Sequence, residues 1–141
     1  CMDENLVLTY TVPGDDFARA GEASSATKQT LKQLGLPADI IRRVSIVMYE
    51  GEINMVIHAD GGEITVTVAP DSVTMVLKDT GPGIPDVEQA MQAGWSTASG
   101  EARDLGFGAG MGLPNMKRNA DVLNIDTTVG VGTTVTAVVK F

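Results

Sequence analysis

Runs rich in β-branched residues recur along the chain, and polar turn residues separate them. Residues 6–12 alternate loosely between apolar and polar side chains, which is typical of a strand with one buried face. Pro70 and Asp71 stand between two such runs and predict a hairpin. Five strands are expected in all, at residues 6–12, 63–69, 73–78, 122–128 and 133–139.

Helices are expected between these strands, and several carry residues that start or stop helices. Asp15 or Asp16 can cap the first helix, and Gly35 stands where a glycine commonly follows a helix C-terminus. Pro37 can begin the second helix, and the glycines after Asp60 can end it. The expected helices run from the first cap to residue 34, and over residues 37–58, 85–93 and 113–120.

The order of these elements predicts the fold class. It reads strand, helix, helix, strand, strand, helix, loop, helix, strand, strand, with the non-periodic segment 94–107 as a mobile loop. Strands that arrive in adjacent pairs favour an antiparallel or mixed sheet covered by helices. We therefore expect an α/β (α+β) two-layer sandwich, with a mixed, mostly antiparallel sheet and helices on one face. A chain of 141 residues has the size of one domain, so residues 1–141 are expected to form a single unit.

Composition excludes several classes of protein. Hydrophobic residues make up 43% of the chain, too many for a disordered protein. No apolar run approaches the roughly 18 residues that span a bilayer, and the N-terminus has no basic and apolar leader, so we expect no membrane contact and a cytoplasmic location. The net charge of −8 argues against direct nucleic-acid binding. Cys1 is the only cysteine, which excludes an intrachain disulfide and fits a reducing cytoplasm.

Two glycine-containing segments, in this order, indicate a purine-nucleotide site. Asp79 follows the apolar run 73–78, and Gly81 and Gly83 after it would let the backbone approach a flat ligand. A later loop alternates glycine with other residues and opens into the helix expected at 113–120. Its unpaired amides would converge at a helix N-terminus, an arrangement that favours a bound polyphosphate. The glycines of this loop are Gly106, Gly108, Gly110 and Gly112.

Other interpretations of the glycine loop are weaker. A P-loop needs Gly-Lys-Ser/Thr after its glycines, whereas Leu113 and Pro114 follow Gly112. A Rossmann loop needs the spacing G-x-G-x-x-G directly after a strand. Counted from Gly108, Leu113 stands where the third glycine should be, and counted from Gly106, Met111 does. A purely structural loop is the remaining alternative, and its pairing with the Asp79 segment disfavours it.

The helix expected at 37–58 carries the residues that could do chemistry. Glu50 and Asn54 are four positions apart and therefore share one face. Asn54 supplies a neutral oxygen suited to Mg²⁺, and Glu50 could accept a proton from an attacking hydroxyl or water. The alternative is an ordinary polar helix face. Glu52 lies about 200° around the helix from Glu50, so we expect it to face solvent. Gly51 costs a helix about 1 kcal/mol relative to alanine.

Four motifs, in order, resemble those of the Bergerat-fold (GHKL) ATPases, the superfamily that includes the histidine kinases. They are Glu50-x-x-x-Asn54, Asp79-x-Gly81-x-Gly83, Gly108-x-Gly110-x-Gly112-Leu113 and Gly132-Thr133. Within the superfamily the chain is most similar to the small anti-sigma-factor and stress-response switch serine kinases, because residues 94–97 and 113–118 resemble the segments that flank the lid in that group. The resemblance implies a histidine-kinase-like ATPase fold.

The resemblance also implies a role for each matching residue in binding ATP and Mg²⁺. Asp79 would accept a hydrogen bond from the adenine amino group, Asn54 would hold Mg²⁺, and Glu50 would be the general base. Residues 96–107 would form a lid, from which Arg103 could reach the γ-phosphate. The other positions would line the base pocket, donate amides to the phosphates or close over the nucleotide: Gly81, Gly83, Gly108, Gly110, Met111, Gly112, Leu113 and Thr133.

The implied function is an ATP-dependent serine/threonine protein kinase of the anti-sigma regulatory type. It would transfer the γ-phosphate to a small antagonist protein, similar to an anti-anti-sigma factor, and so switch a sigma factor or a stress-signalling complex. A homodimer is compatible with this class. Two alternatives stay open: a stand-alone catalytic domain of a histidine kinase, and a non-enzymatic binding module whose conformation ATP controls.

Overall fold

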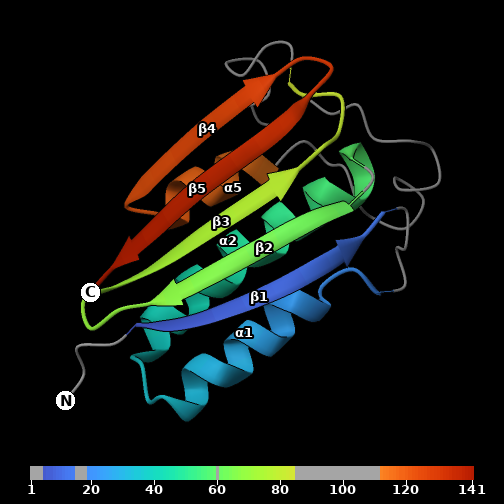
Figure 1. The fold of residues 1–141 in the computed structure, drawn as a ribbon. Helices are drawn as coiled ribbons and strands as arrows, with labels where there is room; N and C mark the ends of the chain where they lie inside the picture. The colour runs from blue at the N-terminus through green and yellow to red at the C-terminus, as the bar shows by residue number, and fades with distance from the viewer. Residues whose placement is uncertain (1–4, 15–18, 60, 85–111) are drawn as a thin grey trace.

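The computed structural model describes residues 5–14, 19–59, 61–84 and 112–141, and all structural statements below refer to these residues (Figure 1). They form five strands and three helices. The elements are β1 (Leu6–Pro13), α1 (Glu22–Gln33), α2 (Ala38–His58), β2 (Gly61–Val68), β3 (Ser72–Asp79), α5 (Gly112–Asn119), β4 (Val122–Thr128) and β5 (Gly132–Lys140).

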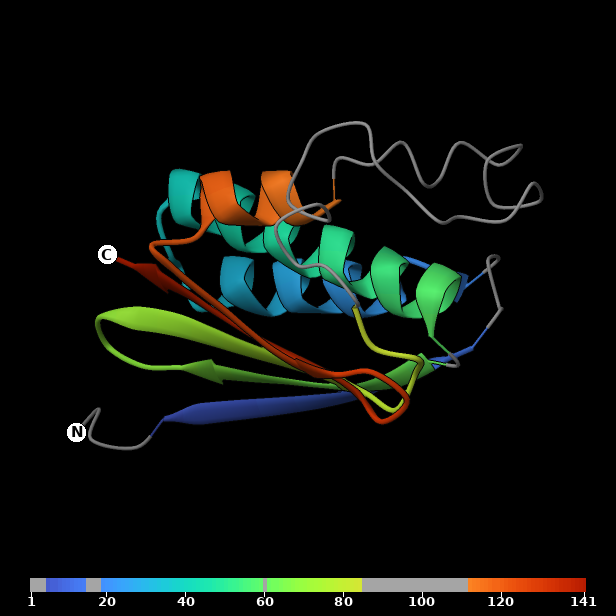
Figure 2. The same cartoon turned by 90° about the horizontal axis from the view of Figure 1, so that it is seen from above.

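The five strands form one sheet in the order β1-β2-β3-β5-β4, and every neighbouring pair is antiparallel. Helices α1, α2 and α5 lie together on one face of this sheet (Figure 2). The expected two-layer sandwich with a mostly antiparallel sheet is therefore confirmed. The register places Asp79, the last residue of β3, between Gly62 of β2 and Thr133 of β5.

Most expected elements agree with the structure to within two residues, but the start of the first helix does not. Gly35 follows α1 with a positive φ of 76°, as a C-terminal glycine should. The helix begins at Glu22 rather than near Asp15 or Asp16, because Gly21 has φ 99° and cannot continue a right-handed helix in that conformation. The helix expected at 85–93 and the loop expected at 94–107 lie outside the described residues.

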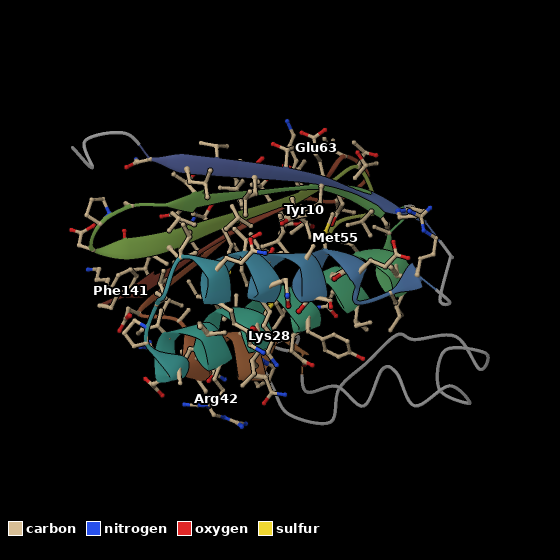
Figure 3. The ribbon with its side chains drawn as sticks, turned by 90° about the horizontal axis from the view of Figure 1, so that it is seen from below. Tyr10, Lys28, Arg42, Met55, Glu63 and Phe141 are labelled. Carbon is tan, nitrogen blue, oxygen red and sulfur yellow. The ribbon has the colours of Figure 1, made fainter. Side chains whose placement is uncertain are left out.

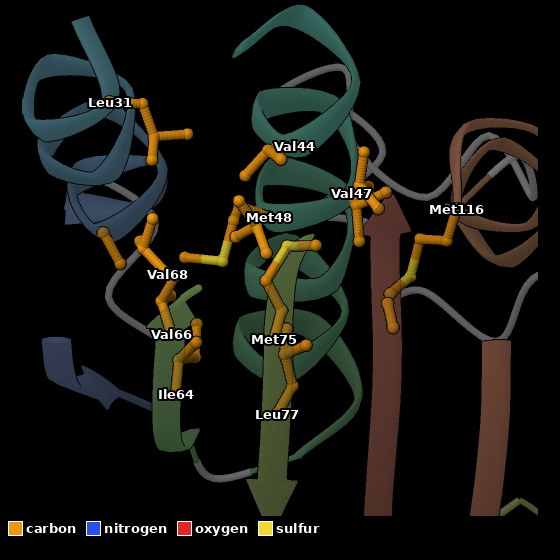
Figure 4. Close-up of a cluster of buried hydrophobic side chains, with 14 of the residues drawn as sticks. Leu31, Val44, Val47, Met48, Ile64, Val66, Val68, Met75, Leu77 and Met116 are labelled. Carbon is orange, nitrogen blue, oxygen red and sulfur yellow. The ribbon is translucent and has the colours of Figure 1, made fainter. Parts of the chain in front are cut away.

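The core fills the space between the sheet and the helices (Figure 4). Alternate residues of β2 and β3 point toward the helices, while a stripe of each helix points back toward the sheet. Tyr10 and Met55 lie between the two layers (Figure 3). In the parts of the chain that are described, no helix is long and apolar enough to cross a membrane. The largest fully buried side chains include Leu31, Val44, Met48, Ile64, Val66, Met75 and Met116.

Hydrogen bonds around Asp121, the residue before β4, form a clamp that holds α5 beside α2. Arg43 of α2 donates to the backbone oxygen of Asn119 (3.0 Å) and to Asp121 Oδ2 (3.1 Å), and the Lys140 amide of β5 donates to the same oxygen (2.6 Å). The Lys140 amide is the main cause that holds the pKa of Asp121 below its usual value, and Arg43 acts in the same direction. The carboxylate therefore stays ionised, and the clamp intact, until pH falls through this lowered pKa.

Gly51 lies within α2 at a point where three elements approach one another. A Cβ at this position would collide with Leu77 Cδ2 of β3 and would lie 3.3 Å from Met116 Cε of α5. Leu77 and Met116 are both buried and packed, so neither side chain can move away without displacing others. Glycine therefore allows α2 to pack closely against the sheet and α5, which offsets its poor helix propensity.

We predict that Gly51→Ala lowers the free energy of unfolding by about 1–2 kcal/mol, because overpacking outweighs the gain in helix propensity. Leu77→Val removes the atom that would collide, so Gly51→Ala should cost less in that background. Urea unfolding of the wild type, the two single variants and the double variant measures this coupling. If Gly51→Ala stabilises the protein, α2 has free space at this position.

Candidate nucleotide-binding site

Asp79 ends β3 with its carboxylate held by two backbone amides. Its Oδ1 accepts hydrogen bonds from the amide of Gly81 (2.9 Å) and the amide of Thr133 (3.2 Å). The first amide belongs to the turn that follows β3, and the second to the neighbouring strand β5. Within the described ranges Oδ2 has no hydrogen-bond partner. The arrangement orients the carboxylate and leaves one oxygen for a donor from a ligand.

The turn after Asp79 is joined to the hairpin between β4 and β5. The Ile84 amide donates to Thr127 Oγ1 (2.9 Å), whose oxygen lies 2.8 Å from Oγ1 of the buried Thr133. Gly83 has φ 81°, and a Cβ there would lie 2.7 Å from the backbone oxygen of Thr128. Only glycine fits this conformation and this close approach without strain. The second glycine of the Asp79 motif therefore holds the turn against the hairpin that contains Thr133.

The first glycine of the motif, Gly81, packs against the end of α2. A Cβ at Gly81 would lie 2.7 Å from Cβ of Ala59, the residue that follows α2. The turn that carries Asp79 thus lies beside the last turns of the helix that carries Asn54. Ala59 and Gly81 are 22 residues apart in sequence, and they approach this closely because Gly81 has no side chain.

Helices α2 and α5 bring the two candidate residues of α2 next to the end of the glycine loop. A Cβ at Gly112, the first residue of α5, would lie 3.0 Å from Nδ2 and 3.1 Å from Oδ1 of Asn54. One turn further along α5, Asn115 donates a hydrogen bond from Nδ2 to Glu50 Oε2 (3.3 Å). Asn54 and Glu50 therefore face α5 at successive turns. Leu113 is buried and anchors α5 in the core.

The position of Asn54 fits a ligand of a magnesium ion that is shared with a nucleotide. Within the described ranges, no three or more His, Cys, Asp or Glu side chains gather in one place. Asn54 is half-buried and next to Gly112, where the phosphates of a nucleotide would lie if the glycine loop binds them. Mg²⁺ usually takes one or two protein oxygens and completes its shell with phosphates and water. Gly108, Gly110, Met111 and Arg103 lie outside the described residues.

Glu52 does not face solvent, so that expectation was wrong. Its side chain is 2% exposed, and its two oxygens accept hydrogen bonds from the amides of Ala23 (3.1 Å) and Ser24 (3.0 Å). These are the second and third amides of α1, whose N-cap residue Gly21 has no side chain to accept them. Glu52 therefore caps α1 from a neighbouring helix, and its charge meets the positive end of the helix dipole.

The apolar repeat of α2 contains the signal that locates Glu52. Met48 lies four positions before it and Val56 four positions after it, and both are fully buried. Residues four apart share a helix face, so Glu52 occupies a core position. A glutamate at such a position indicates a buried carboxylate with hydrogen-bond partners. The expectation gave more weight to the charge of the residue than to its place in the repeat.

The family model described as "Histidine kinase-like ATPase domain" matches residues 15–139. The match covers most of the chain, which therefore belongs to the histidine kinase-like ATPase family. This confirms the superfamily and the fold that the four sequence motifs predict. Membership of an ATPase family also implies that the chain binds ATP.

Relatives of the chain are named as a regulatory kinase and as anti-sigma factors. The serine/threonine-protein kinase RsbT of Bacillus subtilis is 29% identical over 115 residues, which are 79% of this chain and 80% of that protein. The anti-sigma F factor of Lysinibacillus sphaericus is 32% identical over an alignment of 146 positions, with 99% and 94% coverage. The anti-sigma F factor of Bacillus licheniformis is 29% identical over 137 residues, with 93% and 87% coverage. These names agree with the regulatory class predicted from the sequence.

The capping role of Glu52 predicts that Glu52→Gln lowers the free energy of unfolding by about 1–3 kcal/mol. Glutamine accepts with only one terminal atom and turns an amino group toward a helix amide, so one buried donor loses its partner. Glu63→Gln on the exposed face of β2 is the matched control and should change stability by less than about 0.5 kcal/mol. Urea unfolding measures both variants. Equal stability of both variants and the wild type would mean that the bonds to Ala23 and Ser24 contribute little.

Proposed function

We propose that this protein is an ATP-dependent serine/threonine kinase of the anti-sigma type, which transfers the γ-phosphate of ATP to a small antagonist protein. The phosphorylated antagonist would no longer act in the same way on a partner, such as a sigma factor or a stress-signalling complex. The observation that carries the proposal is the pairing of α2 with α5, in which Gly112 lies beside Asn54 and Asn115 donates a hydrogen bond to Glu50. A metal ligand and an acid then stand one turn apart beside the glycine loop. The names of the relatives support the same class.

Asp79 is suited to select adenine. Its Oδ1 is already bonded to two backbone amides, so Oδ2 is the oxygen that would accept a hydrogen bond from the adenine amino group. Guanine carries an oxygen acceptor at the corresponding position. Two opposed acceptors in a buried site typically cost about 1–3 kcal/mol. The carboxylate therefore favours ATP over GTP, with Thr133 and Gly83 lining the base pocket.

Asn54 would hold Mg²⁺ through its side-chain oxygen, and the phosphates and water would complete the shell. When bound, the ion supplies positive charge that stabilises the transferring phosphoryl group. Gly112 lies beside Asn54, so an amide at the end of the glycine loop and the metal ligand would both lie next to the phosphates of the nucleotide. Gly108 and Gly110 would add further amides, with Met111 and Leu113 next to the nucleotide.

Glu50 is the residue that would accept the proton of the attacking hydroxyl. The hydroxyl oxygen forms a bond to the γ-phosphorus, the bond from this phosphorus to the bridging oxygen breaks, and ADP leaves. Asn115 donates to Glu50 Oε2 (3.3 Å) and accepts a hydrogen bond from Arg118 (3.2 Å). These bonds orient the carboxylate and leave Oε1 for the substrate. Phosphoryl transfer depends mainly on such positioning and on charge stabilisation.

Removal of the base and removal of the metal ligand should have different consequences. Glu50→Gln should leave ATP affinity within about twofold and lower the rate of transfer by about 10²- to 10⁴-fold, the usual contribution of a positioned general base. Asn54→Ala should weaken Mg²⁺-dependent ATP binding and lower the rate as well. The measurements are calorimetric titration with ATP and single-turnover transfer from [γ-³²P]ATP to purified small proteins encoded beside its gene.

Glu63→Gln provides the control for this experiment, because Glu63 is exposed on β2 and lies on the sheet rather than on α2. It should behave as the wild type in binding and transfer. Full transfer activity of Glu50→Gln would show that Glu50 is not the general base. Normal ATP binding without transfer to any protein would instead favour a binding module that ATP controls.

A further inference from the structure

The outer side of the helical layer contains an open groove of about 1060 Å³. Residues of α2 line it from Ala38 to Glu50, a length of about 18 Å at 1.5 Å per residue. Helices α1 and α5 border it, since both pack against α2. Ile41 and Tyr49 give the groove an apolar part, and Tyr49 remains 41% exposed.

The groove is locally basic in a chain whose net charge is −8. Lys28, Lys32 and Arg42 lie on its lining, and Lys28 and Arg42 point away from the sheet on the same side of the helical layer (Figure 3). Among the described residues two carboxylates also line it, Glu22 and Glu50. Glu22 is paired with Arg19 (3.3 Å) and Arg42 with Asp39 (2.8 Å). Lys28 and Lys32 therefore carry most of the positive charge. No ion pair is formed by Lys28 or Lys32 with the residues that the structure describes. This charge is complementary to an acidic ligand.

Among the described residues, the groove and the proposed catalytic site share Glu50 and Asn115. These two residues line the end of the groove, whereas Asn54, Asp79, Gly112 and Thr133 do not belong to its lining. A ligand in the groove would therefore reach the base without occupying these four residues assigned to the nucleotide. The length along α2 corresponds to about five or six residues of extended chain.

We propose that this groove docks an acidic segment of the protein that accepts the phosphoryl group and places its hydroxyl at Glu50. The inference rests on the proposed kinase function and adds to it the binding surface and the chemistry of the substrate. Acidic side chains of the segment meet Lys28 and Lys32, an apolar side chain packs on Tyr49, and the serine or threonine hydroxyl lies at the Glu50 end. Recognition through exposed charges makes the affinity for the acceptor sensitive to salt.

A charge reversal in the groove tests the proposal. The double variant Lys28→Glu/Lys32→Glu alters two exposed side chains of α1 that take no part in the nucleotide site. The matched control Lys78→Glu/Lys117→Glu makes the same change in charge on exposed residues that do not line the groove. Thermal unfolding and calorimetric titration with ATP establish that both variants fold and bind nucleotide as the wild type does.

The first readout is steady-state transfer to the protein that accepts phosphate from the wild type. The groove variant should raise KM for this acceptor at least tenfold, with kcat and ATP affinity within twofold of the wild type, and the control should change neither. An unchanged KM in the groove variant overturns the proposal. So does a change in oligomeric state by sedimentation without a change in KM, because the groove would then be an interface between two copies of the chain.

The second readout does not need transfer, so failure of the groove and failure of the kinase proposal can be separated. Fluorescent ten-residue peptides carry one serine among either acidic or lysine residues, and anisotropy reports their binding. The acidic peptide should bind the wild type and the control variant, bind the groove variant at least tenfold more weakly, and compete with the acceptor protein where one exists. If no protein is phosphorylated but this pattern holds, the kinase assignment fails and the acidic docking surface stands. Equal binding of the acidic peptide to all variants, or none to the wild type, overturns the groove proposal.

Discussion

The buried carboxylate of Glu52 joins α1 to α2, the helix that carries Glu50 and Asn54 of the proposed nucleotide site. An ionised group inside a protein is strongly unfavourable without partners, and the amides of Ala23 and Ser24 supply them. Those amides in turn have no cap of their own, because Gly21 precedes the helix. The carboxylate of α2 and the free amides of α1 therefore supply each other's hydrogen-bond partners. Ser24 adds a second connection, because its hydroxyl donates to the backbone oxygen of Ser45 (3.1 Å). The position of α2 depends on α1 through this pair of contacts.

Three consecutive residues of α2 face three different partners, and together they define where the site lies. Glu52 binds α1, Gly51 allows close contact with β3 and α5, and Glu50 faces Asn115 at the end of the outer groove. With the helix held in this way, Asn54 meets Gly112 at the start of α5. The sheet contributes independently, since the register of β3 and β5 places Asp79 opposite Thr133. The geometry of the proposed site thus depends on packing contacts that do not themselves involve a ligand.

Local patterns in the sequence predicted the strands, the long helix and the nucleotide motifs, because alternation, helix-stopping glycines and short motifs act over a few residues. The start of α1 could not be located in this way, since its capping group, Glu52, is 30 residues from Glu22 in sequence. The contacts from Asn115 to Glu50 and from Gly81 to Ala59 could not be predicted from the sequence either, because they arise only when distant elements pack together. Glu52 itself was misplaced although the apolar repeat of α2 indicates its buried position. The groove between α1 and α5 has no sequence signature at all.

Selection of adenine by Asp79 is the central claim, and calorimetric titration with ATP and GTP in Mg²⁺ tests it most directly. The wild type should bind ATP at least about tenfold more tightly than GTP, because one opposed acceptor pair costs about 1–3 kcal/mol. In Asp79→Asn the side-chain oxygen can still accept hydrogen bonds from the amides of Gly81 and Thr133, so the melting temperature should remain that of the wild type. The amino group of the introduced asparagine would then face the base, which should lower the affinity for ATP and raise the affinity for GTP. Equal affinity of the wild type for ATP and GTP would contradict the assignment of this site.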